Sequence, residues 1–285
     1  MSKSLLSIGN PKTMKGQKKG YLTGILHLLP SNYSSIMNVC PDASPGCKST
    51  CLNFAGRGQF SSTQLARKKK NELLKKDKAE FMRCLHHDIT LLVNKAAREH
   101  LVPVVRLNGT SDLPWETMPY FLPGPNPLGP ATSYANLMEA FPEVQFYDYT
   151  KSQRRMNNYL ESLDPDQKGI VDRWPENYSL TFSRSELNES FCQSVLNRGG
   201  RVAIVFKKLW ADGMLSMRID RAHLAGWDRL YPVVNGEEDD LRFSDPGGII
   251  ALKAKGLATK DQTGFVVPER NVEWFFTSTR KEVYA

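Results

Sequence analysis

The chain has no long apolar run and few cysteines, and both shortages exclude classes of protein. Its longest apolar stretch, residues 21–30, includes a histidine and is far shorter than the ~20 residues that a membrane-spanning helix needs. Residues 1–20 hold lysines and turn formers but not the apolar centre of a signal peptide. Five cysteines in 285 residues do not make a disulfide scaffold, because a chain this long can bury enough surface without one. We therefore expect a soluble protein without a membrane partner, whose cysteines are mostly free thiols.

The composition is that of an ordinary globular protein with an excess of positive charge. Hydrophobic residues make up 40% and charged residues 24% of the chain, which excludes an intrinsically disordered protein. The formal net charge is +8, and such a charge favours polyanionic partners such as nucleic acid or a phosphorylated cofactor. Much of the excess lies in two runs, residues 12–19 and 67–78, and runs of this kind can also be plain solvated surface.

Strand patterns alternate with helical patterns along the first 230 residues. Five short stretches rich in β-branched and aromatic residues predict strands at 21–29, 101–107, 144–149, 178–182 and 201–206. The longest helical region runs from about Ser62 to Glu99, and Asp77 with Glu80 forms a capping-box pattern inside it. Successive strand–helix units imply parallel strands with right-handed crossovers. We expect an α/β fold, a partial or complete parallel (β/α) barrel in residues 1–230, and a small β-rich C-terminal extension in residues 231–285.

Polar side chains follow the second, third and fourth predicted strands, where the site of a parallel α/β fold is usually built. Each could be only a turn or capping residue, but several such clusters favour a shared site. We expect four of these residues to be catalytic and four to bind a cofactor. The catalytic candidates are Asp112, Asp148, Lys151 and Glu186, and the cofactor-binding candidates are Arg106, Asn108, Thr110 and Ser183.

Three cysteines follow the first predicted strand and form the most informative cluster in the sequence. Cys40, Cys47 and Cys51 are separated by six and three residues, and Pro41 and Pro45 bend the segment between them. Their sulfurs can converge to within ~4–7 Å, as the ligands of one metal site must. Soft thiolates select zinc or an iron–sulfur cluster. A closed zinc site needs four ligands, whereas a cubane held by three cysteines leaves one iron open for a substrate or cofactor. We expect a [4Fe–4S] cluster, with zinc as the alternative and no metal as the third possibility.

Two further cysteines and an acidic turn complete the set of candidates. Cys84 and Cys192 lie among apolar helix positions and are expected to be buried, inert thiols. The acidic turn at residues 235–245 is either a solvated surface turn or a lid over the barrel mouth. In the lid interpretation, Arg242 pairs with Asp112, Asp148 or Glu186.

A cysteine-bearing loop after the first strand of an α/β barrel resembles the radical S-adenosylmethionine enzymes. Those enzymes usually have three and two residues between their cysteines, whereas this chain has six and three. The segment after the second strand, Asn108-Gly109-Thr110, is the nearest counterpart of the glycine-rich motif that holds the methionine end of the cofactor. The resemblance implies a [4Fe–4S] cluster on the three cysteines and S-adenosylmethionine as a second cofactor.

Eight short segments spread along most of the chain carry a closer resemblance. They are similar to the phage gene product 88 family, which implies a phage-encoded protein in the cytoplasm of the infected host cell, with a cysteine-held cluster and no particular reaction. The segments are residues 10–16 (NPKTMKG), 20–23 (GYLT), 38–41 (NVCP), 45–47 (PGC), 53–58 (NFAGRG), 106–112 (RLNGTSD), 146–151 (FYDYTK) and 252–256 (LKAKG).

Three functions are compatible with these observations. The first is an iron–sulfur enzyme of radical type that acts on a small polar or nucleotide-like substrate, in which the cluster supplies the electron and the protein supplies orientation and charge. The second is a nucleic-acid-binding protein with a structural zinc site, whose residues 12–19 contact phosphates. The third is a host-interaction protein without catalysis, because fold alone does not fix function.

Overall fold

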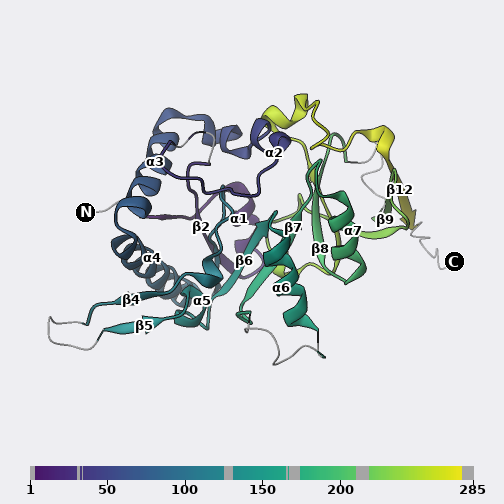
Figure 1. The fold of residues 1–285 in the computed structure, drawn as a ribbon. Coiled ribbons are helices and arrows are strands. Elements are labelled where there is room, and N and C mark those ends of the chain that lie inside the picture. The colour runs from purple at the N-terminus through teal and green to yellow at the C-terminus, as the bar shows by residue number, and fades with distance from the viewer. Residues whose placement is uncertain are drawn as a thin grey trace.

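A ten-stranded sheet is the framework of the molecule (Figure 1). The structure, a computed structural model, describes residues 4–30, 33, 35–124, 131–164, 166, 174–209 and 218–277. The strands in their order across the sheet are β1 (Leu6–Ser7), β2 (Tyr21–Leu26), β3 (Val102–Arg106), β6 (Gln145–Thr150), β7 (Tyr178–Ser183), β8 (Arg201–Phe206), β11 (Gly248–Lys253), β10 (Tyr231–Asn235), β9 (Arg218–Leu224) and β12 (Val272–Thr277).

The central part of this sheet is parallel, as the alternation of strand and helix patterns predicts. β2, β3, β6, β7 and β8 are the five expected strands, and each pairs in parallel with the next along the chain. β11 continues the parallel part beside β8, and β10 follows β11. Antiparallel pairing occurs where β1 joins β2 and where β9 joins β10 and β12. The carboxyl ends of the parallel strands therefore lie along one edge, called here the carboxyl edge.

A closed barrel is not confirmed. Within the described residues the sheet is open, because β1 and β12 lie at its two ends and do not pair with each other. Residues after 230 contain β10, β11 and β12, and β11 confirms the strand expected at 248–254. These strands join the same sheet through the parallel pairing of β11 with β8.

The long helical region expected between the first two parallel strands is two helices. α3 spans Ser61–Lys76 and α4 spans Lys78–Arg98. Asp77 separates them because its backbone is not helical and its carboxylate accepts a hydrogen bond from the Glu80 N–H at 2.9 Å. This contact is one half of the expected capping box. The Glu80 side chain does not complete the box, since it pairs with Arg83 at 2.6 Å.

Three helices cover one face of the parallel strands and enclose the main core. They are α4, α6 (Gln153–Leu163) and α7 (Glu189–Asn197), and Figure 1 shows α6 and α7 beside β6, β7 and β8. Fully buried side chains from helices and strands meet between them, among them Phe81, Ile89, Val105, Phe146 and Ile204. The short helix α5 (Leu137–Ala140) and the hairpin of β4 (Tyr120–Leu122) and β5 (Thr132–Tyr134) extend from this layer.

The opposite face of the sheet is covered by α1 (Pro11–Gln17) and by residues 236–245. The Phe243 ring packs edge-on against Tyr21 of β2 at 5.4 Å between centroids and lies 5.8 Å from the Tyr147 ring of β6. Residues 12–19 hold the acidic turn in place, because Lys15 of α1 donates to the Glu237 carbonyl at 3.1 Å and Lys19, just after α1, pairs with Asp239 at 2.5 Å. Short 3₁₀ helices connect the remaining segments, at Leu52–Phe54, Gly56–Gln59, Trp115–Thr117, Arg242–Ser244, Gly256–Lys260 and Glu269–Asn271.

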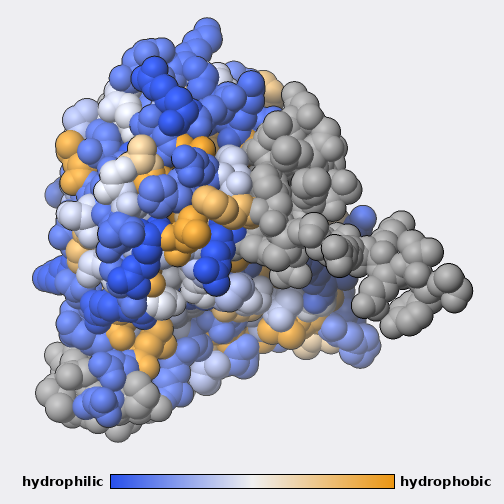
Figure 2. Space-filling model, turned by 90° about the vertical axis from the view of Figure 1, so that its right-hand side faces the viewer, coloured by the Kyte–Doolittle hydropathy of each residue, from blue (hydrophilic) through white to orange (hydrophobic). Residues whose placement is uncertain are grey.

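The face of the molecule seen in Figure 2 is mostly hydrophilic. Hydrophobic residues appear on it as small, separate patches and not as one continuous area. Patches of that size are normal on a globular surface and do not indicate a docking site.

Candidate functional site

The cysteine loop lies at the carboxyl edge of the sheet. Cys47 belongs to the short helix α2 (Pro45–Ser49), which stands near the upper end of β7 in Figure 1. The hydroxyl of Ser44 caps this helix by accepting a hydrogen bond from the Cys47 N–H at 3.1 Å, and proline is favoured in the first turn. The sequence Ser-Pro-Gly-Cys thus fixes the backbone conformation around Cys47.

Glu186, in the turn after β7, anchors this helix to the sheet. Its Oε1 accepts from the Gly46 N–H at 2.7 Å, and its Oε2 accepts from the Ser44 hydroxyl at 2.9 Å. The approach requires glycine at position 46, since an added Cβ would lie 2.3 Å from Thr263 Oγ1 and 2.7 Å from Glu186 Oε2. Glu186 therefore positions the cysteine loop, a role that uses both carboxylate oxygens.

Cys40 is tied to the loop that follows β3. Its thiol donates to the Thr110 carbonyl at an Sγ–O distance of 3.6 Å. Next to it, the Asp112 N–H donates to the Val39 carbonyl at 2.7 Å. The Thr110 hydroxyl in turn donates to the Leu28 carbonyl at 2.5 Å. The first cysteine thus sits between the ends of β2 and β3, as expected for a site at the carboxyl edge.

Cys51 lies close to Cys47 and to two cations. Burial raises the pKa of the Cys51 thiol, and the neighbouring Cys47 raises it further. Arg67 of α3 and Lys151, which follows β6, act in the opposite direction and favour the Cys51 thiolate. A thiol with cations nearby is the kind that becomes a metal ligand when its proton leaves.

The three cysteines of the loop have the chemistry of ligands for a thiolate-bound metal. Their arrangement in the structure is not a closed metal site. Cys40, Cys47 and Cys51 are half-buried, and none of the three forms a disulfide bond. Across the described ranges, no three Cys, His, Asp or Glu side chains form a group that could hold a metal ion. Three soft ligands on one short loop are nonetheless the chemistry that zinc and iron–sulfur clusters select. Convergence of the three sulfurs on one metal stays a prediction.

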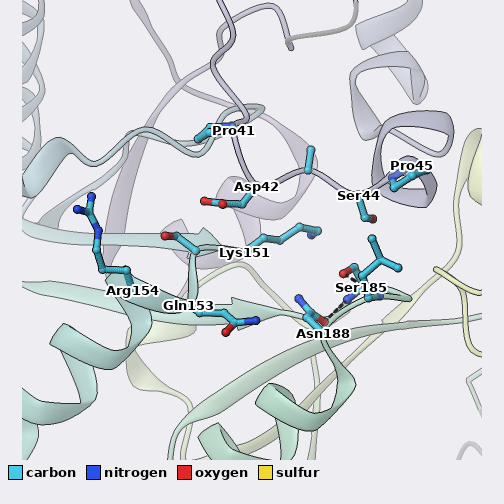
Figure 3. A pocket seen from close by; sticks show the side chains of 12 residues that line it. Pro41, Asp42, Ser44, Pro45, Lys151, Gln153, Arg154, Ser185 and Asn188 are labelled. Atoms are coloured by element: carbon cyan, nitrogen blue, oxygen red, sulfur yellow. Dashed lines mark hydrogen bonds between the residues drawn. The ribbon is translucent and has the colours of Figure 1, made fainter.

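A cleft of about 740 Å³ separates the cysteine loop from the ends of β6 and β7 (Figure 3). Residues 41–45 form one wall, and residues 151–154 with Ser185, Leu187 and Asn188 form the other. Figure 3 shows the Lys151 side chain lying across the cleft below Asp42 and Ser44. The lining combines ammonium, guanidinium, carboxylate, hydroxyl and amide groups, so the cleft suits a polar ligand.

Lys151 is the sequence-predicted residue that lines this cleft most directly. Its ammonium donates to the Ser183 hydroxyl at 2.6 Å and lies 5.3 Å from the centre of the Phe265 ring. Its backbone N–H donates to Asp112 Oδ2 at 2.8 Å. The ends of β3, β6 and β7 are thereby joined at one point, which brings together three of the expected polar clusters.

Asp112 belongs to a buried ion-pair network behind the cleft. Its second carboxylate oxygen pairs with Arg155 of α6 at 2.6 Å, and Arg155 also pairs with Glu116 at 2.8 Å. The Arg155 side chain is 4% exposed, so both carboxylates compensate a charge that would be costly to bury alone. Asp112 thus orients the loop after β3, and its carboxylate does not line the cleft.

Asp148 and Asn108 support the same loop from below. Asp148 is fully buried and accepts hydrogen bonds from the Asn108 N–H at 2.6 Å and from the Tyr178 hydroxyl at 2.8 Å. Burial raises the pKa of the Asp148 carboxyl to about 7. The Asn108 side chain accepts from the Trp115 indole N–H at 3.1 Å and from the Leu113 N–H at 2.9 Å. Neither side chain lines the cleft.

Arg106 lies on the other face of the sheet from Asp148. It pairs with Asp240 at 2.9 Å, and its guanidinium lies 4.6 Å from the centre of the Tyr149 ring. The Tyr147 hydroxyl donates to the same Asp240 carboxylate at 3.0 Å. Arg106 therefore helps to fix residues 236–245 against the sheet. Like Asn108 and Thr110, which were expected to bind a cofactor with it, Arg106 does not line the cleft.

The lid expectation for the acidic turn is wrong. Arg242 is 1% exposed and pairs with Asp239 at 3.1 Å and with Asp245 at 2.9 Å, not with Asp112, Asp148 or Glu186. Its partners are three residues away on either side, and such local pairs form at little entropic cost. The turn contacts the segment just after α1 through Lys19, and it contacts the start of β8 through Arg201, whose guanidinium donates to the Asp245 carbonyl at 3.0 Å.

The expectation of buried thiols outside the loop is confirmed for Cys192 but not for Cys84, which is half-buried. Cys192 is fully buried, and burial raises the pKa of its thiol to about 12. Cys84, on α4, donates to the Glu80 carboxylate at 3.3 Å.

Three residues that support the candidate site were not predicted from the sequence, because they belong to no motif: Arg67, Arg155 and Glu116. The position of Arg67 in a lysine run even suggested a solvated residue.

No helix within the described ranges is long and apolar enough to cross a membrane.

Comparisons with known proteins assign a family and nothing finer. A search of curated proteins and a search of solved structures each find no match. The model of one family, described as Gene product 88, matches residues 4–269, which confirms the resemblance carried by the short segments along the chain. The chain therefore belongs to the phage gene product 88 family.

Proposed function

We propose that the chain is an iron–sulfur protein in which Cys40, Cys47 and Cys51 hold a [4Fe–4S] cluster beside a substrate cleft. The observation that carries the proposal is the anchoring of the cysteine-bearing helix α2 by Glu186. A carboxylate from the end of β7 fixes the loop where the cleft opens. Function in parallel α/β folds is usually built at this edge.

When bound, such a cluster supplies an electron to a reaction, and its ligands, hydrogen bonds and burial tune it. The chain's own residues would provide charge balance and orientation. Arg67 and Lys151 both act electrostatically to favour the thiolate of Cys51. Lys151, held by a 2.6 Å hydrogen bond to the Ser183 hydroxyl, would orient a substrate from the opposite wall.

The lining of the cleft supports a small polar or nucleotide-like substrate. Lys151 and Arg154 offer positive charge, while Ser44, Gln153 and Asn188 offer hydroxyl and amide groups. A radical type of reaction also needs S-adenosylmethionine as co-reactant. Asn108 and Thr110 point into their own loop and the end of β2, so we place that co-reactant in the cleft and not on these two residues.

Anaerobic purification with iron, zinc and acid-labile sulfide analysis tests the proposal. We expect iron and sulfide in equal amounts and the visible absorbance of an iron–sulfur cluster. Stoichiometric zinc in a colourless protein would contradict it and favour a structural metal site. Equilibrium binding of S-adenosylmethionine to the cluster-loaded protein then separates a radical enzyme from an iron–sulfur protein that only transfers electrons.

A further inference from the structure

The outer face of α3 carries a cluster of exposed lysines, defined here as Lys68, Lys69, Lys75 and Lys76. At 100° per residue, these four positions fall within about 120° of the helix circumference. The side of the helix that faces the protein is buried, through Leu74 and, next to the edge of the lysine cluster, Asn71. The lysine cluster therefore forms one continuous stripe that faces away from the protein.

The lysine cluster carries an excess of positive charge. No ion pair or hydrogen bond in the described part of the chain involves any of the four ammonium groups. Glu72 is the one acidic residue of α3, and it is exposed on the same face. Glu72 is three or four residues from each of the four lysines, so it offsets part of their charge. Four lysines against one glutamate still leave the face with a net positive charge.

The dimensions of the stripe fit a nucleic acid backbone. From Lys68 to Lys76 the helix rises about 12 Å. Long, flexible lysine side chains at both ends can therefore follow several successive phosphates of one strand. The net charge of +8 for the whole chain would steer such a polyanion toward the protein.

Exposed apolar side chains lie at the beginning of the same helix. Phe60, the residue that precedes α3, is 56% exposed, and Leu65 within α3 is 53% exposed. Leu52, in the 3₁₀ segment before the helix, is 61% exposed. An exposed aromatic ring beside a basic stripe is the pairing that single-stranded nucleic acids use, because each unpaired base offers a face for stacking.

We infer that the outer face of α3 binds single-stranded nucleic acid, with the lysine cluster on the phosphates and Phe60 stacked on a base. This inference goes beyond the proposed function and does not depend on the cluster. It also assigns the polyanion contact to α3 and not to residues 12–19, because Lys15 and Lys19 are occupied by the acidic turn.

Fluorescence anisotropy with a labelled oligo-dT and a labelled oligo-U tests the inference on the full-length protein. If four phosphate contacts form, the log–log salt dependence has a slope of about −2.8, so affinity falls ~50-fold between 50 and 200 mM salt. Replacing the four lysines by glutamine should weaken binding at least about tenfold and flatten this slope. Phe60→Ala should weaken binding without changing the slope, because stacking releases no counterions.

A matched variant removes the same charge elsewhere. Lys207, Lys208, Lys253 and Lys260 are also exposed, and their replacement by glutamine should leave binding within about twofold of the unaltered protein if contact is local to α3. Equal weakening in both quadruple variants would overturn the inference, because it would show a response to net charge alone. Tighter binding to duplex DNA or to acidic phospholipid vesicles than to the oligonucleotides would overturn it as well.

Discussion

Glu186 and Asp148 are both carboxylic acids supplied by neighbouring strand units, but their surroundings give them different tasks. Glu186 reaches across the carboxyl edge and accepts two hydrogen bonds from the cysteine loop. Asp148 faces the helix-covered side, where it holds the loop after β3. Both were expected from the sequence to be catalytic. The alternation of side chains along β6 predicts that Asp148 lies opposite Tyr147 and Tyr149, but it does not tell which side is buried.

Replacing Glu186 by glutamine should loosen the cysteine loop. The amide cannot supply two charge-assisted acceptors, and such hydrogen bonds contribute about 1.5–3 kcal/mol. We expect a loss of that order in the free energy of unfolding from urea denaturation, together with a lower metal content. Glu143→Gln, at an exposed position, is the control and should change neither quantity. Equal stability of the two variants would refute the anchoring role.

Asp148 should make stability depend on pH between about 4 and 7. Because burial raises the pKa of its carboxyl to about 7 from 3.8, the folded state holds this proton more tightly than the unfolded state. Its contribution to stability is therefore full at low pH and is lost as the pH rises through this window, at about 1.4 kcal/mol per pKa unit. Asp148→Asn should remove that component, so the difference in unfolding free energy between the two proteins changes with pH. Parallel curves from pH 4 to 7 would contradict the assignment.

At the scale of elements, most of the parallel strands could be predicted and the shortest strands could not. The five expected strands are buried runs of apolar and aromatic residues bounded by polar turns: β2, β3, β6, β7 and β8. Such runs can be recognised in the sequence itself. β1 and β4 are two and three residues long, too short to show any period. The sequence shows a capping-box pattern at the break between α3 and α4. The break itself was not predicted, because helix-forming residues continue on both sides of it.

Asp77→Ala should destabilise the junction of α3 and α4. The variant loses the acceptor for the Glu80 N–H at the start of α4, a change that typically costs about 1 kcal/mol. Thermal denaturation followed by circular dichroism measures the effect, and Asp77→Ser should retain most of the stability because serine is also a good N-cap residue. A serine variant as unstable as the alanine variant would show that capping is not what Asp77 contributes.

At the scale of the whole molecule, the parallel topology of the sheet predicts where the candidate site lies. Parallel strands bring their carboxyl ends together, and the cleft is built there from the segments after β2, β6 and β7. The rule does not say which polar residues line the cleft and which support it. Lys151 lines it, whereas Asp112 and Arg155 support it through a buried ion pair. The sequence pattern of α6 does not predict that Arg155 forms a buried ion pair with Asp112.

The central claim is that three cysteines of one loop hold a metal cluster, and the iron content of cysteine variants tests it most directly. Cys47→Ser should lose most of the iron and acid-labile sulfide after anaerobic reconstitution, because a thiolate ligand is removed. Cys192→Ser is the matched control, since Cys192 is fully buried in α7, and it should keep its iron if it still folds by circular dichroism. Equal iron content in the wild type and the Cys47 variant would contradict the account.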